Sequence, residues 1–195
     1  MSKPLIFIFL IIGQVLFYSC HIAHDREIIC YENLKKATDL ANINPDNKAS
    51  LDSALIIVNS CMKCDSIKAA VVDLKIRLLI TLGKFKEGSD FIDSLQVSDF
   101  TYPYKKELNH DNFVALNFAS NMDTISRDKV YKKMATYLEG YITSNNLKSK
   151  EFQEAYIELN GLSEKFIDST TLNRQLDSLK IQYPNEVKFL DFFNH

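Results

Sequence analysis

The chain has 195 residues, a formal net charge of −2 and 46% hydrophobic residues, which is enough for one domain with a real core. Its lysines are scattered among acidic residues and form no basic patch, which argues against a nucleic-acid partner. With five glycines, four prolines and no tryptophan, the composition favours helices joined by short polar turns.

The first residues have the layout of a cleavable signal peptide. Lys3 precedes an apolar run over residues 5–18, which is shorter than the roughly 20 apolar residues that a membrane-spanning helix needs. The run ends at Ser19 and Cys20, and this end resembles the lipobox at which bacterial lipoproteins are cleaved and acylated. The resemblance implies a signal peptide over residues 1–19 and lipidation of Cys20.

A lipidated Cys20 predicts a protein held on a membrane surface of the bacterial cell envelope, at either the inner or the outer membrane. The acyl chains, such as palmitate, supply more than one hydrocarbon tail, and each buried CH2 contributes about 0.8 kcal/mol. Residues 20–29 are then a lipidated tether, and residues 30–195 a helical domain. The alternatives are an ordinary secretory signal cleaved nearby and an uncleaved anchor.

Apolar residues spaced by three and four predict helices along the rest of the chain. A polar turn over residues 42–48 separates the first two helices, Gly83 stands where a helix C-cap is expected, and Pro184 stops the last helix. The predicted helices cover residues 30–41, 51–62, 66–82, 104–119, 127–143, 149–166 and 171–183, followed by a short aromatic cap over residues 186–194.

The segment 66–82 differs from the others because it carries two apolar stripes. One stripe is Ile67, Val71, Leu74, Leu78 and Leu82, and the other is Val72, Ile76, Leu79 and Ile80. A helix that is apolar on two faces must be covered from two sides. We therefore predict that this helix is an interior member of a layered helical stack.

Three segments of the chain align with one another. They place the small residues Ala54, Gly88 and Ala155 at one position, with offsets of 34 and 67 residues, close to one and two copies of a fixed period. Fixed periods of 20 to 50 residues indicate stacked supersecondary units.

The pattern Leu82-Gly83-x-Phe85-x-x-Gly88 resembles the tetratricopeptide repeat family, with Gly88 where that family usually has alanine. The resemblance implies an all-α fold of stacked antiparallel helix pairs, in an irregular form. An irregular helical bundle, whose amphipathic helices share small and large core positions, is the alternative.

Cys61 and Cys64 form a C-x-x-C pair, which suits a redox site, half of a zinc site or a local disulfide. A zinc site would need a second ligand pair at suitable spacing, and a thioredoxin-like site would need a preceding strand, so an inert or locally disulfide-bonded pair is favoured. His21, His24 and Asp25 lie in the tether, an unfavourable place for a metal site. We expect no metal and no cofactor.

Six tripeptides with Asp followed by Ser or Thr resemble the acceptor motif of an O-glycosylation system that acts on exported proteins in some Gram-negative bacteria. Helix N-capping is the alternative interpretation, and it suits Asp65, Asp123 and Asp168 well. The candidate acceptors in predicted turns are Ser66, Thr124 and Ser169.

No arrangement of residues points to catalysis. His110 neighbours Asp111, but spacing ties no nucleophile to them, so we expect no enzyme. The expected function is a lipid-anchored adaptor or scaffold that binds a protein or peptide. An immunity lipoprotein that neutralises a toxin at the membrane is the alternative, and an enzyme acting on envelope polymers is less favoured.

Overall fold

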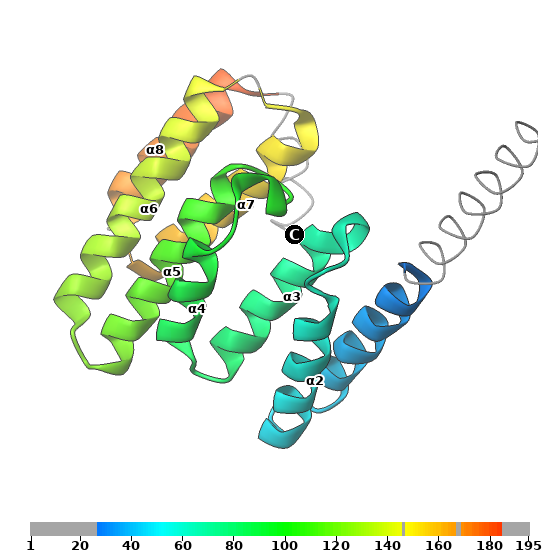
Figure 1. The fold of residues 1–195 in the computed structure, drawn as a ribbon. Helices are drawn as coiled ribbons and strands as arrows, with labels where there is room; N and C mark the ends of the chain where they lie inside the picture. The colour runs from blue at the N-terminus through cyan, green and yellow to red at the C-terminus, as the bar shows by residue number, and fades with distance from the viewer. Residues whose placement is uncertain (1–26, 146, 167–168, 185–195) are drawn as a thin grey trace, which may run out of the picture. The chain divides into compact units, whose positions relative to one another are not determined.

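The computed structural model describes residues 27–145, 147–166 and 169–184 (Figure 1). Every regular element in these residues is a helix, which confirms the all-α class. The chain divides into two compact units between Gly83 and Lys84. The region that the sequence predicted as one helical domain, residues 30–195, therefore falls into two units.

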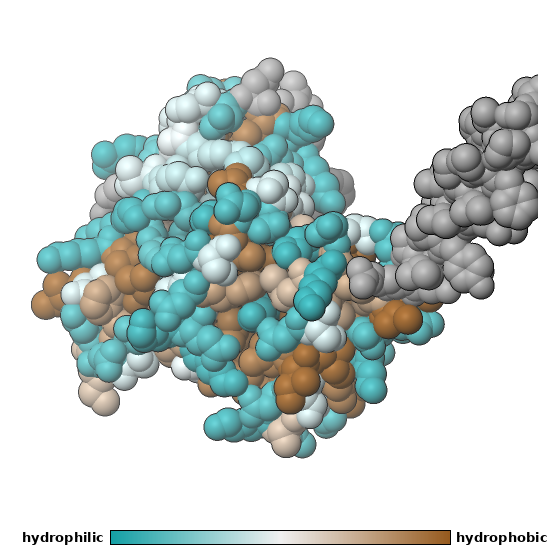
Figure 2. All heavy atoms as spheres, in the orientation of Figure 1, coloured by the Kyte–Doolittle hydropathy of each residue, from teal (hydrophilic) through white to brown (hydrophobic). Residues whose placement is uncertain are grey.

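The described residues of the first unit form three helical segments, and α2 packs against α3. The segments are residues 27–43, α2 (Lys48–Cys61) and α3 (Lys68–Thr81), with a short 3-10 helix at Asp65–Ile67. α2 begins in the predicted polar turn, where the Asn47 side chain accepts a 3.2 Å hydrogen bond from the Ser50 backbone N–H. Not all of its apolar residues face the core: Ile56 is 71% exposed, and Figure 2 shows apolar atoms over α2.

α3 is buried on both of its apolar faces. The buried residues of the two stripes are Val71, Leu74 and Leu78 on one and Val72, Ile76 and Leu79 on the other. The helix closes at Gly83, which has a φ of +68° and donates its N–H to the Ile80 carbonyl at 3.0 Å. Glycine at this position adopts the left-handed conformation without a Cβ penalty. Both the double stripe and the glycine cap are confirmed.

The second unit is a run of five helices in which each helix packs against the next one along the chain. α5 and α6 lie side by side in Figure 1, joined by a short turn. The elements are α4 (Phe85–Asp93), a 3-10 helix (Val97–Asp99), α5 (Tyr104–Ser120), α6 (Thr124–Ser144), α7 (Ser149–Phe166) and α8 (Ser169–Gln182).

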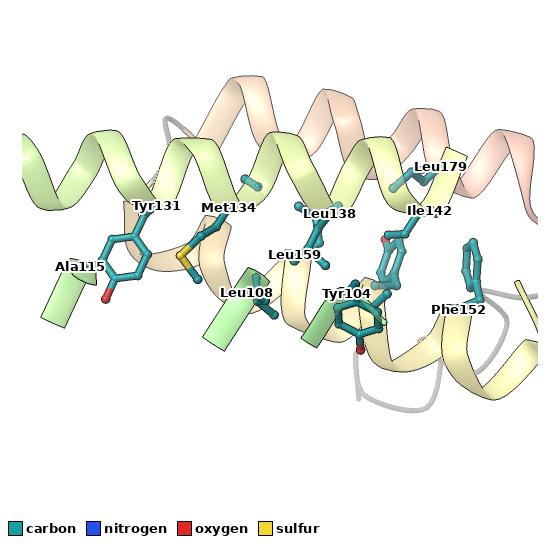
Figure 3. Packing of buried hydrophobic residues seen from close by; sticks show 13 residues of the cluster. Tyr104, Leu108, Ala115, Tyr131, Met134, Leu138, Ile142, Phe152, Leu159 and Leu179 are labelled. Carbon is teal, nitrogen blue, oxygen red and sulfur yellow. The ribbon is translucent and has the colours of Figure 1, made fainter. Parts of the chain in front are cut away.

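Residues from α5, α6, α7 and α8 form the core of this unit (Figure 3). On α6 the buried residues Met134, Leu138 and Ile142 repeat every four positions, so one helix face supplies them. Phe152 and Tyr156 pack beside them from α7, with ring centroids 6.1 Å apart. Each fully buried side chain of this size contributes about 1.5–3 kcal/mol, which makes this cluster the main stabilising feature of the unit.

Gly88 permits the close packing of α4 against α5. A Cβ atom placed on Gly88 would overlap the ring of Phe113, a buried residue of α5. A small residue at this position lets the two helices approach closely. The contact also explains why glycine stands where the tetratricopeptide pattern has alanine, since this ring leaves no room for a methyl group.

Met122 closes α5 in an unfavourable backbone conformation. Its φ is +61°, its N–H bonds to the Ala119 carbonyl at 3.1 Å, and the Asp123 N–H bonds to the Phe118 carbonyl at 3.0 Å. This pattern is a Schellman motif, in which glycine usually occupies the left-handed position. The Met122 side chain is 90% exposed and therefore adds little packing that would offset the backbone cost.

Replacing Met122 with glycine is therefore expected to stabilise the protein by about 0.5–1 kcal/mol, because glycine adopts this conformation without strain. For a chain of this size, that corresponds to a rise in Tm of about 1–4 °C in thermal unfolding followed by circular dichroism. The matched control is Gly83→Ala, which places a Cβ in the same backbone region and should lower Tm. A fall in Tm for Met122→Gly would contradict the argument.

Candidate functional site

Several predicted site residues lie outside the described residues. These are the signal peptide over residues 1–19, Cys20, His21, His24, Asp25 and the aromatic cap over residues 186–194. The predicted tether, residues 20–29, enters the described part of the chain at residue 27, where it is already helical. The signal peptide and the lipid anchor therefore stay predictions.

A local disulfide between Cys61 and Cys64, one of the two states that the sequence favoured for this pair, is not the bond that the structure contains. A disulfide joins Cys64 to Cys30, with Cα atoms 6.3 Å apart, and Cys61 is a buried free thiol. Cys61 is the last residue of α2 and lies on its buried face. After the two-residue turn that follows, Cys64 has an extended backbone, and its sulfur bonds to the helical segment 27–43. Sequence proximity favoured a bond between Cys61 and Cys64. The bond that forms instead joins Cys64 to Cys30, which lies 34 residues away in the helical segment 27–43.

The candidate acceptor residues lie at the starts of helices. Ser66 is exposed in the 3-10 helix before α3, and Thr124 is exposed as the first residue of α6. Ser169 is the first residue of α8, and its side chain lies outside the described part.

The alternative interpretation, that the Asp of these motifs caps a helix, holds for Asp123 and fails for Asp65. Asp123 caps α6, because its Oδ1 accepts a 2.9 Å hydrogen bond from the Ser126 N–H. This bond holds the pKa of Asp123 below its usual value. Asp65 is no cap, since the 3-10 helix is preceded by Cys64 and has no side-chain cap. Asp168 lies outside the described residues.

A row of tyrosine hydroxyls and glutamate carboxylates joins α7 to the start of α5 and the end of α6. We call it the tyrosine–glutamate row, and its members are Tyr102, Tyr104, Lys105, Tyr141, Glu151, Glu154 and Glu158. The three glutamates are spaced by three and four residues, so one face of α7 carries them all.

Lys105 is the centre of this row. Its Nζ donates to Glu154 Oε2 at 3.1 Å and lies 3.9 Å from Glu158 Oε1. Tyr102 donates to Glu154 at 3.4 Å, and Tyr104 donates to Glu158 at 3.5 Å. The Lys105 ammonium also lies 5.6 Å from the centroid of the Tyr102 ring, within the range of a cation–π contact. These contacts hold the charges and rings in fixed relative positions.

The row is acidic and partly exposed. Three carboxylates face one ammonium, so its charge is negative. Glu154 and Glu158 are about one third exposed, while Lys105 is 16% exposed. Tyr141 completes the row by donating a 2.7 Å hydrogen bond to Glu151. The arrangement presents carboxylate oxygens beside tyrosine rings, and sequence reasoning missed it because the partners lie about 50 residues apart.

The tyrosines of this unit are expected to make the stability of the protein fall at high pH. Burial, together with the neighbouring carboxylates, raises the pKa of Tyr104 and Tyr141 well above 10, and burial raises the pKa of Tyr156 to about 12. A group with a raised pKa in the folded state stabilises fully below its unfolded pKa, and this stabilisation is lost as the pH rises through the folded pKa.

The tyrosine contribution to stability is therefore expected to be constant below pH 10 and to fall steeply from pH 10 toward 12 and above. We expect the tyrosinate absorbance of the buried rings and the loss of helical circular dichroism to rise together in an alkaline titration. Ionisation of all nine tyrosines near pH 10, with the helices intact, would contradict this prediction.

A second polar cluster brings together residues of α4, α5 and α6. At its centre is Asp111, the one charged residue that is buried in the described part of the chain, at 5% exposure. Lys133 Nζ donates to Asp111 Oδ1 at 3.1 Å and makes an ion-pair contact of 2.8 Å with Oδ2. Lys133 also donates to Glu107 at 2.9 Å. Hydrogen bonds to these two carboxylates, Asp111 first, raise the pKa of Lys133 to about 12.

His110 lies beside this cluster between two carboxylates. Its Nδ1 is 3.4 Å from Asp111 Oδ1, and its Nε2 is 3.7 Å from Asp93 Oδ1. Asp111 is occupied by the Lys133 ammonium, and the cluster contains no nucleophile. The geometry is that of an ion-pair network linking three helices, and it does not resemble a catalytic dyad.

In the described residues, no three His, Cys, Asp or Glu side chains are grouped to hold a metal ion. In the same part of the chain, no helix combines the length and the apolar character needed to cross a membrane. A hollow on α8 has one carboxylate in the described part of its lining, which consists of Thr170, Arg174, Asp177, Ser178 and Ile181.

No protein-family model, curated protein or solved structure matches this chain. Its function must be inferred from its own residues. The tyrosine–glutamate row is the strongest candidate site, because its Glu154 and Glu158 side chains are about one third exposed, whereas Asp111 is buried.

Proposed function

We propose that this chain is a lipid-anchored protein of the bacterial cell envelope, tethered through Cys20, whose helical body binds a protein or peptide partner. The observation that carries the proposal is the tyrosine–glutamate row. Tyrosine rings with polar tips are enriched at binding surfaces, because they supply large contact area and a hydrogen-bonding group together. Charges held in fixed positions add specificity for a partner of opposite charge.

The chemistry of the row indicates a partner segment that carries lysine or arginine. The row has three carboxylates and one ammonium, so an incoming cation meets a net negative surface. Arginine suits it best, since its planar guanidinium pairs with two carboxylate oxygens and also stacks on tyrosine rings. Tyr102 already has one cation beside its ring, which indicates that the ring face suits such contacts.

We further propose that the helical body is an irregular stack of antiparallel helix pairs similar to tetratricopeptide repeats. Gly83 and Gly88, two positions of the matched pattern, serve as a helix cap and a site of close helix approach. The five helices from α4 to α8 each pack against the next one. Stacks of this kind present extended surfaces to peptides and proteins.

The binding proposal is tested by crosslinking the full-length protein in its own membranes and identifying the captured proteins by mass spectrometry. The triple variant Glu151→Gln, Glu154→Gln, Glu158→Gln removes the three negative charges of the row, leaves the positive charge of Lys105, and keeps the shape of the row. We expect it to recover at least about tenfold less partner than the wild type, a loss of about 1.4 kcal/mol. Glu87→Gln, which removes an exposed carboxylate from α4, is the matched control and should recover the partner fully.

Equal recovery by the triple variant and the wild type would overturn the assignment of the row. Failure of the wild type to capture any envelope protein would overturn the binding function itself. The mass of the mature N-terminus tests the anchor separately, because an unmodified chain or cleavage away from Cys20 would exclude lipidation. The same spectra test for sugars on Ser66, Thr124 and Ser169.

A further inference from the structure

Three cysteines lie together in the first unit. Cys30 and Cys64 form the disulfide, and the Cys61 sulfur lies 3.8 Å from the backbone oxygen of Cys30. All three residues are buried, with exposures of 8%, 6% and 1% for Cys30, Cys64 and Cys61. The free thiol is therefore packed against one residue of the disulfide.

The backbone also holds Cys61 close to the other residue of the disulfide. The Cys64 N–H donates to the Cys61 carbonyl at 3.0 Å, which closes a four-residue turn through Met62 and Lys63. Such a turn keeps the Cα atoms of its ends within about 7 Å of each other. Disulfides span Cα separations of about 4.4–6.8 Å. Cys64 is thus within bridging range of both Cys30 and Cys61.

We infer that Cys30, Cys61 and Cys64 form a thiol–disulfide exchange site in which Cys64 pairs alternately with Cys30 and Cys61. The Cys61 thiol gives its proton to solvent, and the thiolate attacks the sulfur of Cys64. The Cys61–Cys64 bond forms, the Cys30–Cys64 bond breaks, and Cys30 leaves as a thiolate that takes up a proton. One disulfide and one thiol are present before and after the step, so no external oxidant or reductant is needed.

The two pairings have different consequences for the fold. The Cys30–Cys64 bond ties the helical segment 27–43 to the turn between α2 and α3 across 34 residues. The Cys61–Cys64 bond closes only the local turn and releases that segment. The structure contains the Cys30–Cys64 bond, so this form is the ground state and the local form is the minor one.

Burial decides how the exchange is observed. A buried thiol reacts with external reagents only when its surroundings open, whereas Cys61 already lies against the backbone of Cys30, one residue of the disulfide. An alkylating reagent therefore traps the minor form, because Cys30 is modified once it is released and the bond cannot reform. The rate should rise with pH, since the thiolate is the nucleophile.

The experiment uses the full-length protein, N-ethylmaleimide and trypsin. Cleavage after Arg26, Lys35, Lys48, Lys63 and Lys68 places each cysteine in its own peptide, residues 27–35, 49–63 and 64–68. Mass spectrometry then distinguishes the two pairings. We expect the untreated protein to link 27–35 with 64–68, and the incubated protein to accumulate 49–63 linked with 64–68 and a modified Cys30. Modification of Cys61 alone, with the original link intact, would overturn the inference.

Two variants complete the test. Cys61→Ser removes the attacking thiol and should abolish modification of Cys30 under the same conditions. Cys30→Ser should form the Cys61–Cys64 link completely, and two free thiols in this variant after air oxidation would overturn the inference. If Cys30→Ser does not fold, as judged by circular dichroism, the trapping of the wild-type protein decides.

Discussion

Gly88→Ala is expected to destabilise the second unit by about 1–3 kcal/mol, the usual cost of overpacking a helix interface. The added Cβ overlaps the ring of Phe113, which is fully buried and has no solvent into which it can swing. Alanine is the better helix former by about 1 kcal/mol, so propensity alone predicts the opposite sign. The clash outweighs propensity here. The urea midpoint of unfolding, followed by circular dichroism, measures the difference.

Two further variants separate the clash from a general effect of glycine. Gly140→Ala on α6 adds a Cβ with no atom within 4 Å, so it should stabilise the protein by about 0.5–1 kcal/mol. Phe113→Leu opens space beside Gly88 and should cost less in the Gly88→Ala background than in the wild type, because neighbouring residues couple. If Gly88→Ala and Gly140→Ala stabilise the protein to the same extent, the close approach of α4 and α5 is contradicted.

The helices could be predicted from the sequence because local patterns determine them. Apolar residues at spacings of three and four located each long helix, and the two stripes of α3 predicted burial on both faces. Boundaries were less certain: α6 begins at Thr124, three residues earlier than expected, because Asp123 caps it. Capping depends on a single side chain, which periodicity does not reveal.

Contacts between helices could not be predicted, since they depend on which faces meet. The disulfide joins residues 34 positions apart, and sequence proximity favoured the wrong partner for Cys64. The boundary between the two units, after Gly83, could not be recognised from the composition, because this glycine is also an ordinary helix cap. The Phe113 ring that faces Gly88 comes from α5, a different helix. The sequence pattern around Gly88 therefore gave no indication of the residue that packs against it.

The candidate sites were missed for the same reason. The tyrosine–glutamate row draws on α5, α6 and α7, and its carboxylates are spaced on α7 like those of any solvated helix face. The sequence did place His110 beside Asp111, but Lys133 arrives from another helix. Lys133 determines the environment of the His110–Asp111 pair, because its ammonium neutralises the Asp111 carboxylate that lies beside the histidine.

Lys133→Met is expected to destabilise the protein by about 1–3 kcal/mol. The variant keeps the apolar stem of the side chain but leaves Asp111 buried without its cation. Removing one partner of a fully buried ion pair costs about 3–5 kcal/mol. The Lys133 side chain is 57% exposed, so water screens the pair and the loss falls to the range of a charged hydrogen bond. Chemical denaturation near neutral pH measures the loss.

The dependence of this loss on pH and on Asp111 identifies its cause. The pKa of Lys133 is raised to about 12, so its stabilising contribution is complete below pH 10.5 and disappears as the pH rises toward 12. The difference between wild type and Lys133→Met should therefore narrow over that interval. Asp111→Asn should restore part of the stability of Lys133→Met, because it removes the uncompensated charge, while Glu107→Gln, at the exposed end of the network, should cost less than 1 kcal/mol. A loss that Asp111→Asn leaves unchanged would mean that the lysine stem, and not its charge, stabilises the junction of α5 and α6.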